Sequence, residues 1–306
     1  MGNPRRIGAR YVGLKSSSRC RCDRFARREP GTDNRMMAHN EWQRRVSRAE
    51  KLAVEYGFAA EILRFYAAVL RFQSDFYIDV ERWIAPADAS ALSREPFTRP
   101  LPAALARRFG PFLSMVERDG PELLRKLATD LSDADEEVHF RLLTDFWYED
   151  EPRVTLTGRP DFFARAFLQP YAAWLRVHSD LRWNGPTPFA CPFCKRRPCV
   201  GVLRPMGDGG LRSLVCSLCL AEWEFRRIVC PGCGEEDHAK LPVYTAEELE
   251  HVRAEACDSC RTYIKTVDMT RSGLAEPLVD EMATIPLDVW VQRKGYAKLQ
   301  SNLLQL

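Results

Sequence analysis

Four Cys-x-x-Cys pairs within seventy residues constrain the fold of this chain more than any other feature. Two residues between cysteines let both thiolates of one turn point at a single metal ion, and two such turns complete a tetrahedral shell of four sulfurs. The first set reads Cys-x2-Cys-x21-Cys-x2-Cys, and after ten residues the second reads Cys-x2-Cys-x23-Cys-x2-Cys. Each longer interval fits one β-hairpin, so the spacing predicts two metal sites with sequentially paired ligands: Cys191, Cys194, Cys216 and Cys219 in site 1, and Cys230, Cys233, Cys257 and Cys260 in site 2.

Two other chemistries use paired cysteines, and neither fits this chain well. A disulfide-linked secreted domain would carry a signal peptide, but no apolar segment of about 7–15 residues follows the basic start at 1–28, so we expect a reducing, cytoplasmic setting. A thioredoxin-like motif would be a lone pair at the start of a helix, whereas four pairs lie here among strand and turn residues. The simplest role for the metal is structural: it would hold a small lobe together, and function would lie on the surface that it organises.

Charge is distributed unevenly along the 306 residues. Residues 1–36 hold ten Lys and Arg against three Asp and Glu, with few apolar side chains, so we expect a basic, disordered tail. The remainder holds 35 Lys and Arg against 39 Asp and Glu, a net −4 within the total of +3. A mildly acidic folded part argues against a broad nucleic-acid-binding face. No run of about 18 apolar residues occurs, which excludes a membrane span.

Residues 37–184 show the apolar spacing of an all-helical domain. From Trp42 to Pro86 apolar side chains recur every three or four positions, which predicts one or two long helices with a break near Gly57. Pro170 is expected to kink the last helix of this domain. The shorter helices that we expect span 101–116, 121–131, 133–148 and 161–181.

After residue 184 the pattern changes to short strands. Apolar runs at 200–204 and 211–216 flank a glycine-rich turn at 207–210, which is typical of a β-hairpin that delivers one cysteine pair opposite another. Further strands are expected over 222–229 and 261–268.

These patterns predict an α+β fold in which two small modules follow the helical domain. The expected boundaries are 185–226 for the first module, 227–270 for the second, and 271–306 for a C-terminal helical segment packed on the modules. Lobes of some forty residues bury too little to be stable alone, while structural zinc contributes about 10–16 kcal/mol in small zinc peptides. Metal loss is therefore expected to unfold them.

Particular residues accompany the cysteines, and together they resemble one known family. The motifs are Cys-Pro-Phe-Cys at 191–194, Cys-Ser-Leu-Cys-Leu-Ala-Glu-Trp at 216–223, Cys-Pro-Gly-Cys-Gly at 230–234, Glu-Ala-Cys-Asp-Ser-Cys-Arg-Thr-Tyr-Ile-Lys at 255–265, and a tail from Val279-Asp280-Glu281 to Gly295-Tyr296. From about residue 45 onward the chain resembles the formate dehydrogenase accessory proteins of the FdhE type. The resemblance implies a cytoplasmic maturation factor with two rubredoxin-like (zinc-ribbon) modules, which acts on the catalytic subunit of a respiratory formate dehydrogenase and binds iron.

Rubredoxin-like knuckles usually place glycine directly after the second cysteine, because the backbone there takes a positive φ. Only Gly234 meets this pattern; the other three positions hold Lys195, Leu220 and Arg261. A residue with a Cβ loses about 1 kcal/mol or more in that conformation. We therefore expect those three turns to depart from strict knuckle geometry.

No catalytic constellation is evident in the sequence. Four thiolates leave no open position on the metal for water or substrate, which disfavours Lewis-acid hydrolysis. The five histidines have neither zincin spacing nor an evident carboxylate partner, and the glycine-rich turn at 207–210 lacks the Lys-Ser/Thr of a phosphate loop. Cys199, outside both sets, is expected to be a small buried hydrophobe.

Three functions remain compatible with the sequence. The leading hypothesis is a non-enzymatic assembly factor, or chaperone, that docks a client subunit. The alternatives are an iron-based redox carrier in the same pathway and, with less support, a nucleic-acid-binding zinc ribbon. Iron and zinc both accept four thiolates in a tetrahedron, so the sequence leaves the identity of the metal open. It also leaves open whether the protein forms a homodimer. For the docking surface we expect Asp280, Glu281 and Asp288 to lie exposed on a helical stretch, with Leu278, Met282, Ile285 and Val289 packed inward.

Overall fold

Two long antiparallel helices form one wall of the molecule. The computed structural model describes residues 5–6, 33–88, 96–148, 161–179, 183, 185, 187–207 and 209–305. Helix α1 (Asp33–Glu55) and helix α2 (Ala60–Asp88) are separated by the short helix η2 (Gly57–Ala59), so the predicted break near Gly57 is confirmed. Buried side chains at helical spacing, such as Leu52 and Leu63, fasten the two helices together. Most of the expected tail at 1–36 lies outside the described residues.

The remaining helices complete a bundle around α6. Helix α6 (Asp161–His178) is buried from Phe162 to Leu175, with Pro170 inside it. Rings from several helices meet there: Phe167 of α6 packs edge-on against Phe109, with ring centroids 5.1 Å apart. The predicted helices are confirmed with small shifts of their ends. The elements that surround α6 are η4 (Ala103–Arg108), α3 (Phe109–Asp119), α4 (Glu122–Ser132) and α5 (Glu136–Tyr148).

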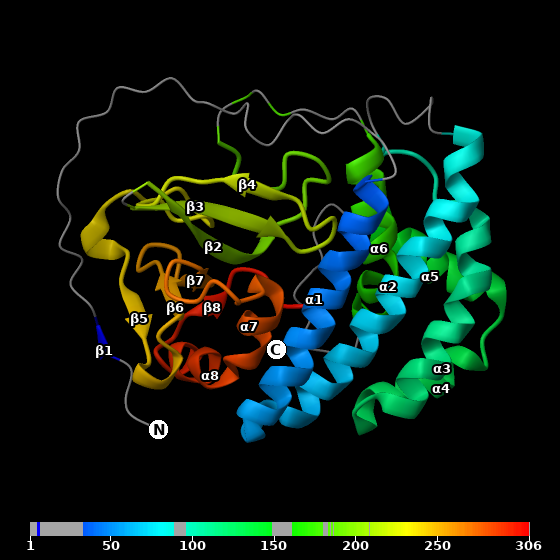
Figure 1. Ribbon diagram of the computed structural model, residues 1–306, viewed down its shortest axis with the longest axis horizontal. Coiled ribbons are helices and arrows are strands. Elements are labelled where there is room, and N and C mark those ends of the chain that lie inside the picture. Colours follow the sequence, from blue (N-terminus) through cyan, green and yellow to red (C-terminus); the bar gives the residue numbers. More distant parts are fainter. Residues whose placement is uncertain are drawn as a thin grey trace.

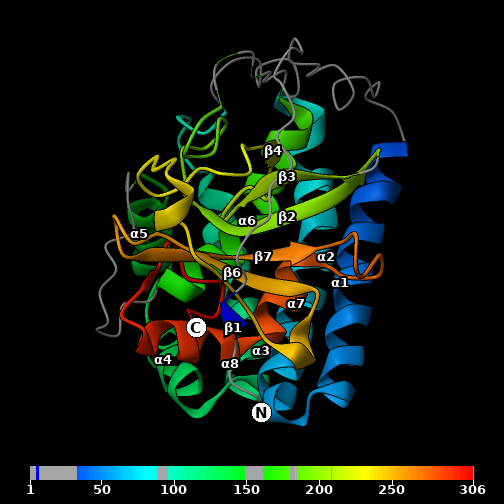
Figure 2. The same cartoon turned by 90° about the vertical axis from the view of Figure 1, so that its left-hand side faces the viewer.

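A single mixed sheet carries all four cysteine pairs at its strand ends or in the loops beside them. Its order is β1-β5-β6-β7-β2-β3-β4, with β8 beside β7, and Figure 2 shows the strands in succession beside the helical wall. The predicted hairpin is confirmed as β2 and β3. The strands are β1 (Arg5–Arg6), β2 (Pro198–Met206), β3 (Gly209–Cys216), β4 (Glu222–Glu224), β5 (Val243–Thr245), β6 (Val252–Ala256), β7 (Thr262–Asp268) and β8 (Ala297–Lys298).

The two modules are joined edge to edge within this sheet. Strand β2 of the first module runs parallel to β7 of the second, with Gly201 opposite Thr266 and Leu203 opposite Asp268. A Cβ on Gly201 would lie 2.3 Å from Thr266 Oγ1, so only glycine permits the observed approach. The expected strand at 222–229 is shorter than predicted, and β5 and β6 were not predicted. Three half-buried residues in β5 carry no alternating pattern that would reveal it.

The C-terminal segment ties the helical wall to the sheet. Helix α7 (Pro277–Ala283) lies against α1, and helix α8 (Ile285–Arg293) packs beside β6 and β8. Figure 1 shows α7 between the sheet and α1, and α8 below the strands. One hydrophobic core extends from Leu52 and Phe112 in the bundle to Cys216, Trp223 and Met282. A second, smaller core lies between the sheet and α8. No described helix is both long enough and apolar enough to cross a membrane.

Candidate metal centres

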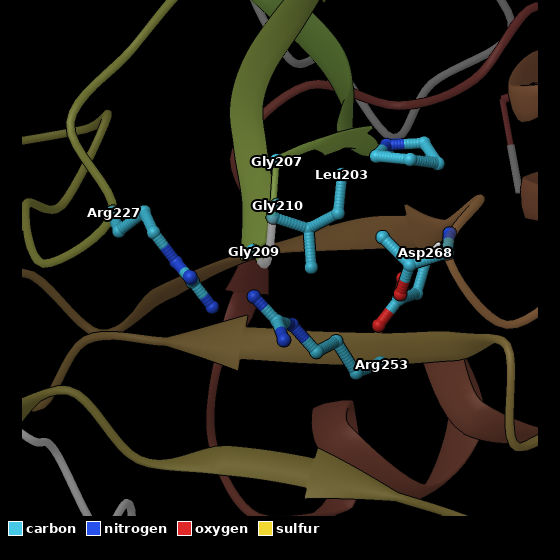
Figure 3. A pocket seen from close by; sticks show the side chains of 9 residues that line it. Leu203, Gly207, Gly209, Gly210, Arg227, Arg253 and Asp268 are labelled. Carbon is cyan, nitrogen blue, oxygen red and sulfur yellow. Dashed lines mark hydrogen bonds between the residues drawn. The ribbon is translucent and has the colours of Figure 1, made fainter.

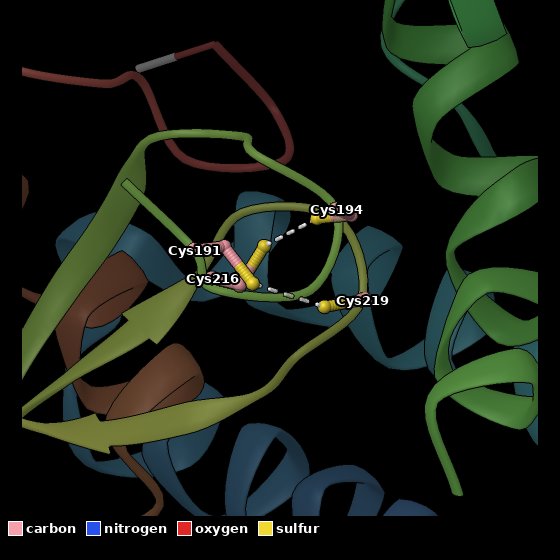
Figure 4. A group of neighbouring side chains, drawn as sticks. All are labelled: Cys191, Cys194, Cys216 and Cys219. Carbon is pink, nitrogen blue, oxygen red and sulfur yellow. Dashed lines mark hydrogen bonds between the residues drawn. The ribbon is translucent and has the colours of Figure 1, made fainter. Parts of the chain in front are cut away.

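The first four cysteines converge in one compact cluster. The Sγ atoms of Cys191 and Cys219 lie 3.5 Å apart, and those of Cys194 and Cys216 lie 3.3 Å apart (Figure 4). All four sulfurs lie within 4.8 Å of one another. A tetrahedral thiolate site with metal–sulfur bonds of about 2.3 Å has sulfur–sulfur edges of about 3.8 Å, whereas a disulfide bond is about 2.05 Å. The cluster therefore has the size of a metal shell, and its cysteines are free thiols.

The last four cysteines form a second cluster of the same kind. Cys230 Sγ lies 3.6 Å from Cys260 Sγ, and Cys233 Sγ lies 3.7 Å from Cys257 Sγ. These four sulfurs also lie within 4.8 Å of one another. The predicted sequential pairing of the cysteines into two sets is confirmed. In each set a hairpin or two neighbouring strands bring one knuckle opposite the other.

Every knuckle has the same backbone geometry, which corrects an expectation from the sequence. Gly234 has φ +80°, and Lys195, Leu220 and Arg261 have φ of +63°, +57° and +57°. The backbone N–H of Lys195 donates to Cys191 O at 3.0 Å, and the equivalent bonds at Gly234 and Arg261 are 3.0 and 2.9 Å long. The prediction that three turns would depart from knuckle geometry was wrong. A residue with a side chain pays a strain of about 1–2 kcal/mol in this conformation, and at Lys195 and Arg261 the hydrogen bond that closes the turn offsets it.

Amide groups inside the turns are directed at the sulfurs. The N–H of Leu218 donates to Cys216 Sγ at 3.3 Å, and the N–H of Gly232 donates to Cys230 Sγ at 3.3 Å. In site 2 the hydroxyl of Thr262 also lies 3.0 Å from Cys260 Sγ. Such donors stabilise negative charge on a sulfur, and metal ligation requires thiolates. Both donor sets, four sulfurs with amide donors, therefore fit a closed four-thiolate centre for iron or zinc.

The two clusters differ in how far they are shielded from solvent. In site 1 three cysteines are buried, and Gln169 of α6 donates to Ser217 O at 3.0 Å within its second knuckle. In site 2 Cys233 is exposed and Cys260 is half-buried. Site 1 thus belongs to the main core of the protein, while site 2 lies at the surface of the second module.

In each cluster one cysteine has a lowered pKa. Burial opposes ionisation of Cys194, but hydrogen bonds from the three other cysteines hold the pKa of Cys194 well below its usual range. Burial raises the pKa of Cys216 and Cys219 well above that range. In site 2 the pKa of Cys260 is about 7, because hydrogen bonds from Thr262 and the other cysteines outweigh its burial. A metal ion that binds all four thiolates must therefore displace protons.

Comparison with known proteins agrees with this architecture. Residues 190–227 match the model of the FdhE central domain, and residues 228–305 match that of the FdhE C-terminal domain. The crystal structure of the FdhE protein from Pseudomonas aeruginosa superimposes with a TM-score of 0.64 at 26% identity, covering 87% of this chain and 96% of that one. The chain belongs to the FdhE family. Its relatives include an FdhE homolog from Aquifex aeolicus, 28% identical over 64% of this chain and 68% of that protein. Another, from Glaesserella parasuis, is 26% identical over 86% and 88%.

In this FdhE family member the three carboxylates expected on a docking surface lie in the interior, so that expectation was wrong. Asp280 is fully buried and accepts hydrogen bonds from Arg48 Nε at 3.0 Å and from His251 Nε2 at 2.7 Å. The ion pair with Arg48 fastens α7 to α1. His251 therefore does have a carboxylate partner, which its sequence neighbours did not reveal.

Glu281 and Asp288 join a buried cluster of charges between β7, β8 and the C-terminal helices. Lys265 Nζ lies 3.2 Å from Glu281 Oε1 and also pairs with Asp288. Lys298 Nζ lies 3.0 Å from Asp288 Oδ1 and contacts Glu281 as well. Two lysines thus face two carboxylates, and the cluster is electrically balanced. Of the apolar residues expected to pack inward, Met282 is fully buried, whereas Val289 is exposed.

Cys199 is the remaining described cysteine outside both clusters. Its side chain is buried on β2, and burial raises the pKa of this thiol to about 12. A buried, protonated thiol is a poor nucleophile, so its environment agrees with the prediction of a small apolar residue.

Proposed function

We propose that this chain is a non-enzymatic accessory factor for a respiratory formate dehydrogenase. The accessory factor would bind the catalytic subunit of that enzyme in the cytoplasm while the subunit matures. One observation carries the proposal: both four-sulfur clusters are built into a sheet that shares its core with the helical domain. Four protein thiolates complete a tetrahedral shell, so the bound metal would organise a surface rather than receive a substrate. Membership of the FdhE family supports the identity of the client.

Capture of the client by metal-site variants tests this function. A Cys257→Ser substitution removes one ligand of site 2, and we expect it to lower metal content, unfold the second module and abolish capture of the formate dehydrogenase catalytic subunit. Cys199→Ala is the matched control, since this cysteine lies outside both clusters, and it should retain metal and capture. Full capture by a metal-free Cys257→Ser protein would contradict a docking role for the metal modules.

The exposure of site 2 favours a second candidate, an iron-based redox carrier. Cys233 reaches the surface, so a metal held there would lie close enough to solvent for electron exchange with a partner. Iron cycles between ferrous and ferric states in a four-thiolate site, and zinc does not. Elemental analysis after anaerobic purification, followed by visible spectra with and without reductant, distinguishes the two: a zinc-only protein that still matures its client would remove the redox alternative.

A further inference from the structure

A cleft of about 450 Å³ lies where the β2–β3 hairpin extends beyond β7. It is separate from both cysteine clusters. Residues of both modules line it: Leu203, Pro205, Gly207, Gly209, Gly210, Arg227, Arg253, Asp268 and Thr270. Figure 3 shows the guanidinium groups of Arg227 and Arg253 pointing toward the same space beside Gly209. The cleft has the size of a typical ligand site.

Among the described residues on the arginine side of the cleft, arginines outnumber carboxylates. Arg253 donates from Nε and Nη2 to Glu255 Oε1 at 2.9 and 2.6 Å, and the buried Arg212 donates to Glu255 Oε2 at 2.6 Å. One carboxylate is thus shared by two arginines. Burial opposes its charge, yet the arginines hold the pKa of Glu255 at about 2, so it stays ionised. Arg227 is exposed and forms no ion pair within the described part of the chain, which leaves its charge uncompensated.

The opposite side of the cleft carries one carboxylate that is already satisfied. Asp268 Oδ1 accepts hydrogen bonds from the backbone N–H of Thr270 at 3.0 Å and from its hydroxyl at 2.5 Å. Arg271 Nε lies 3.8 Å from Asp268 Oδ2. These contacts reduce the repulsion that Asp268 would exert on an incoming anion.

The hairpin leaves the cleft open and gives it an apolar wall. A Cβ at Gly207 would meet nothing within 4 Å, and at Gly209 the nearest atom would be 4.0 Å away. Neither glycine places a side chain there, so the described residues of the turn leave this part of the cleft open. Of the two larger apolar lining residues, Pro205 is exposed beside the arginines and Leu203 is buried, and exposed Met206 continues the hairpin beyond them. An extended peptide with an acidic side chain next to an aliphatic one matches this surface.

We propose that this cleft binds an acidic segment of the client polypeptide, with a client carboxylate paired to Arg227 and Arg253. Arginine forks bind carboxylates through two parallel hydrogen bonds, which gives orientation as well as attraction. Because the hairpin that lines the cleft belongs to the first module and both arginines belong to the second, the segment would be bound only when both modules are folded. This inference rests on the proposed docking function and names the contact through which it acts.

The test compares Arg227 with its neighbour in sequence. Arg226 is exposed like Arg227, pairs with Glu236 at 2.5 Å and does not line the cleft, so Arg226→Ala is the matched control. A tethered array of overlapping peptides from the formate dehydrogenase catalytic subunit identifies binding segments, and fluorescence titration of the strongest gives the affinity for the intact, metal-loaded protein. We expect acidic segments to bind, with Arg227→Ala weakening binding about tenfold and Arg226→Ala leaving it unchanged. Arg227→Lys should fall between them, and added salt should weaken binding.

Other outcomes would overturn the inference. These are no peptide binding to the wild-type protein, equal binding by the Arg227→Ala protein, or tight binding of inorganic phosphate with no peptide bound, which would assign the cleft to a small anion. Capture of the whole catalytic subunit separates the two proposals. If the Arg227→Ala protein captures the subunit as well as the wild-type protein does, docking is supported and the proposed contact is contradicted. If the wild-type protein captures none, the proposed function itself is contradicted.

Discussion

Three of the four knuckles have a residue with a side chain, Lys195, Leu220 or Arg261, at the positive-φ position where glycine would be unstrained. Lys195 is held in the left-handed conformation by the bond from its own N–H to Cys191 O, and its ammonium group lies 5.4 Å from the ring centre of Trp183. Arg261 stacks on Tyr296, with its guanidinium carbon 4.1 Å from the ring centre, and donates to Lys294 O. At the residue scale these contacts give Lys195 and Arg261 interactions that glycine would lose.

Gly234 is the knuckle position where a side chain is predicted to be costly. A Cβ there would lie 3.3 Å from Phe189 Cζ at φ +80°, so Gly234→Ala adds crowding to backbone strain. We expect it to lower the free energy of unfolding by about 1–2 kcal/mol. Chemical denaturation of the metal-loaded protein measures the change. Lys195→Gly is the comparison and should lie within about 1 kcal/mol of wild type, since relief of strain opposes the added freedom of the unfolded chain; equal losses in both variants would contradict the account.

At the scale of elements, the parallel pair of β2 and β7 decides how the modules are arranged. A small metal-bound module could fold beside its neighbour without sharing hydrogen bonds. Here the register that places Val202 opposite Val267 puts both in the smaller core, so the sheet continues across the junction. The sheet can continue from β2 to β7 only because Gly201, which has no side chain, lets Thr266 approach closely.

Gly201→Ala tests the junction directly. The added methyl group would overlap Thr266, so we expect a loss of about 2–3 kcal/mol in the free energy of unfolding and weaker protection of β2 and β7 amides from hydrogen exchange. Gly110→Ala provides the same chemical change in α3, where a Cβ would meet nothing within 4 Å, and should stabilise by about 0.5–1 kcal/mol. Unchanged exchange in the Gly201→Ala protein would show that the strands separate without cost.

The whole molecule is held together by charges that are distant in sequence. Arg48 on α1 and Asp280 on α7 are 232 residues apart, and both are nearly or fully buried. His251, from the loop before β6, completes the contact. Burial opposes the charge of Asp280, but hydrogen bonds from His251 and Arg48 lower its pKa below the usual value. The helical wall and the second module therefore meet at one ionised carboxylate.

Asp280→Asn should destabilise the protein in a pH-dependent way. A carboxyl whose pKa is depressed by folding stabilises the folded state above its ordinary pKa of about 4, and that contribution is lost as the pH falls through the folded value. At pH 7 we expect a loss of about 3 kcal/mol, because Arg48 is left without its buried partner. The difference from wild type should shrink below about pH 4. Denaturant titrations across this range, with exposed Asp130→Asn as control, measure it; a constant difference would contradict the ion-pair explanation.

Local spacing in the sequence was sufficient to predict the grouping of eight cysteines into two clusters, the β2–β3 hairpin and most helices. Two cysteines separated by two residues, and a hairpin of some twenty residues, are short-range features whose chemistry depends little on the rest of the chain. Helical periodicity is equally local, so the break at Gly57 and the helix around Pro170 were visible.

Only the tertiary structure shows that Asp280, Glu281 and Asp288 are buried and that the two modules share one sheet. Alternating charge and apolarity along 279–296 predicted a solvated carboxylate face, but Arg48, Lys265 and Lys298 come from α1, β7 and β8 and compensate those charges inside. Likewise, no local pattern specifies that Gly201 faces Thr266, or that Arg227 and Arg253 share a cleft. A buried charge needs an ionic partner, and a strand needs a neighbouring strand, and here both come from distant parts of the sequence. These contacts can therefore be identified only when the fold is known.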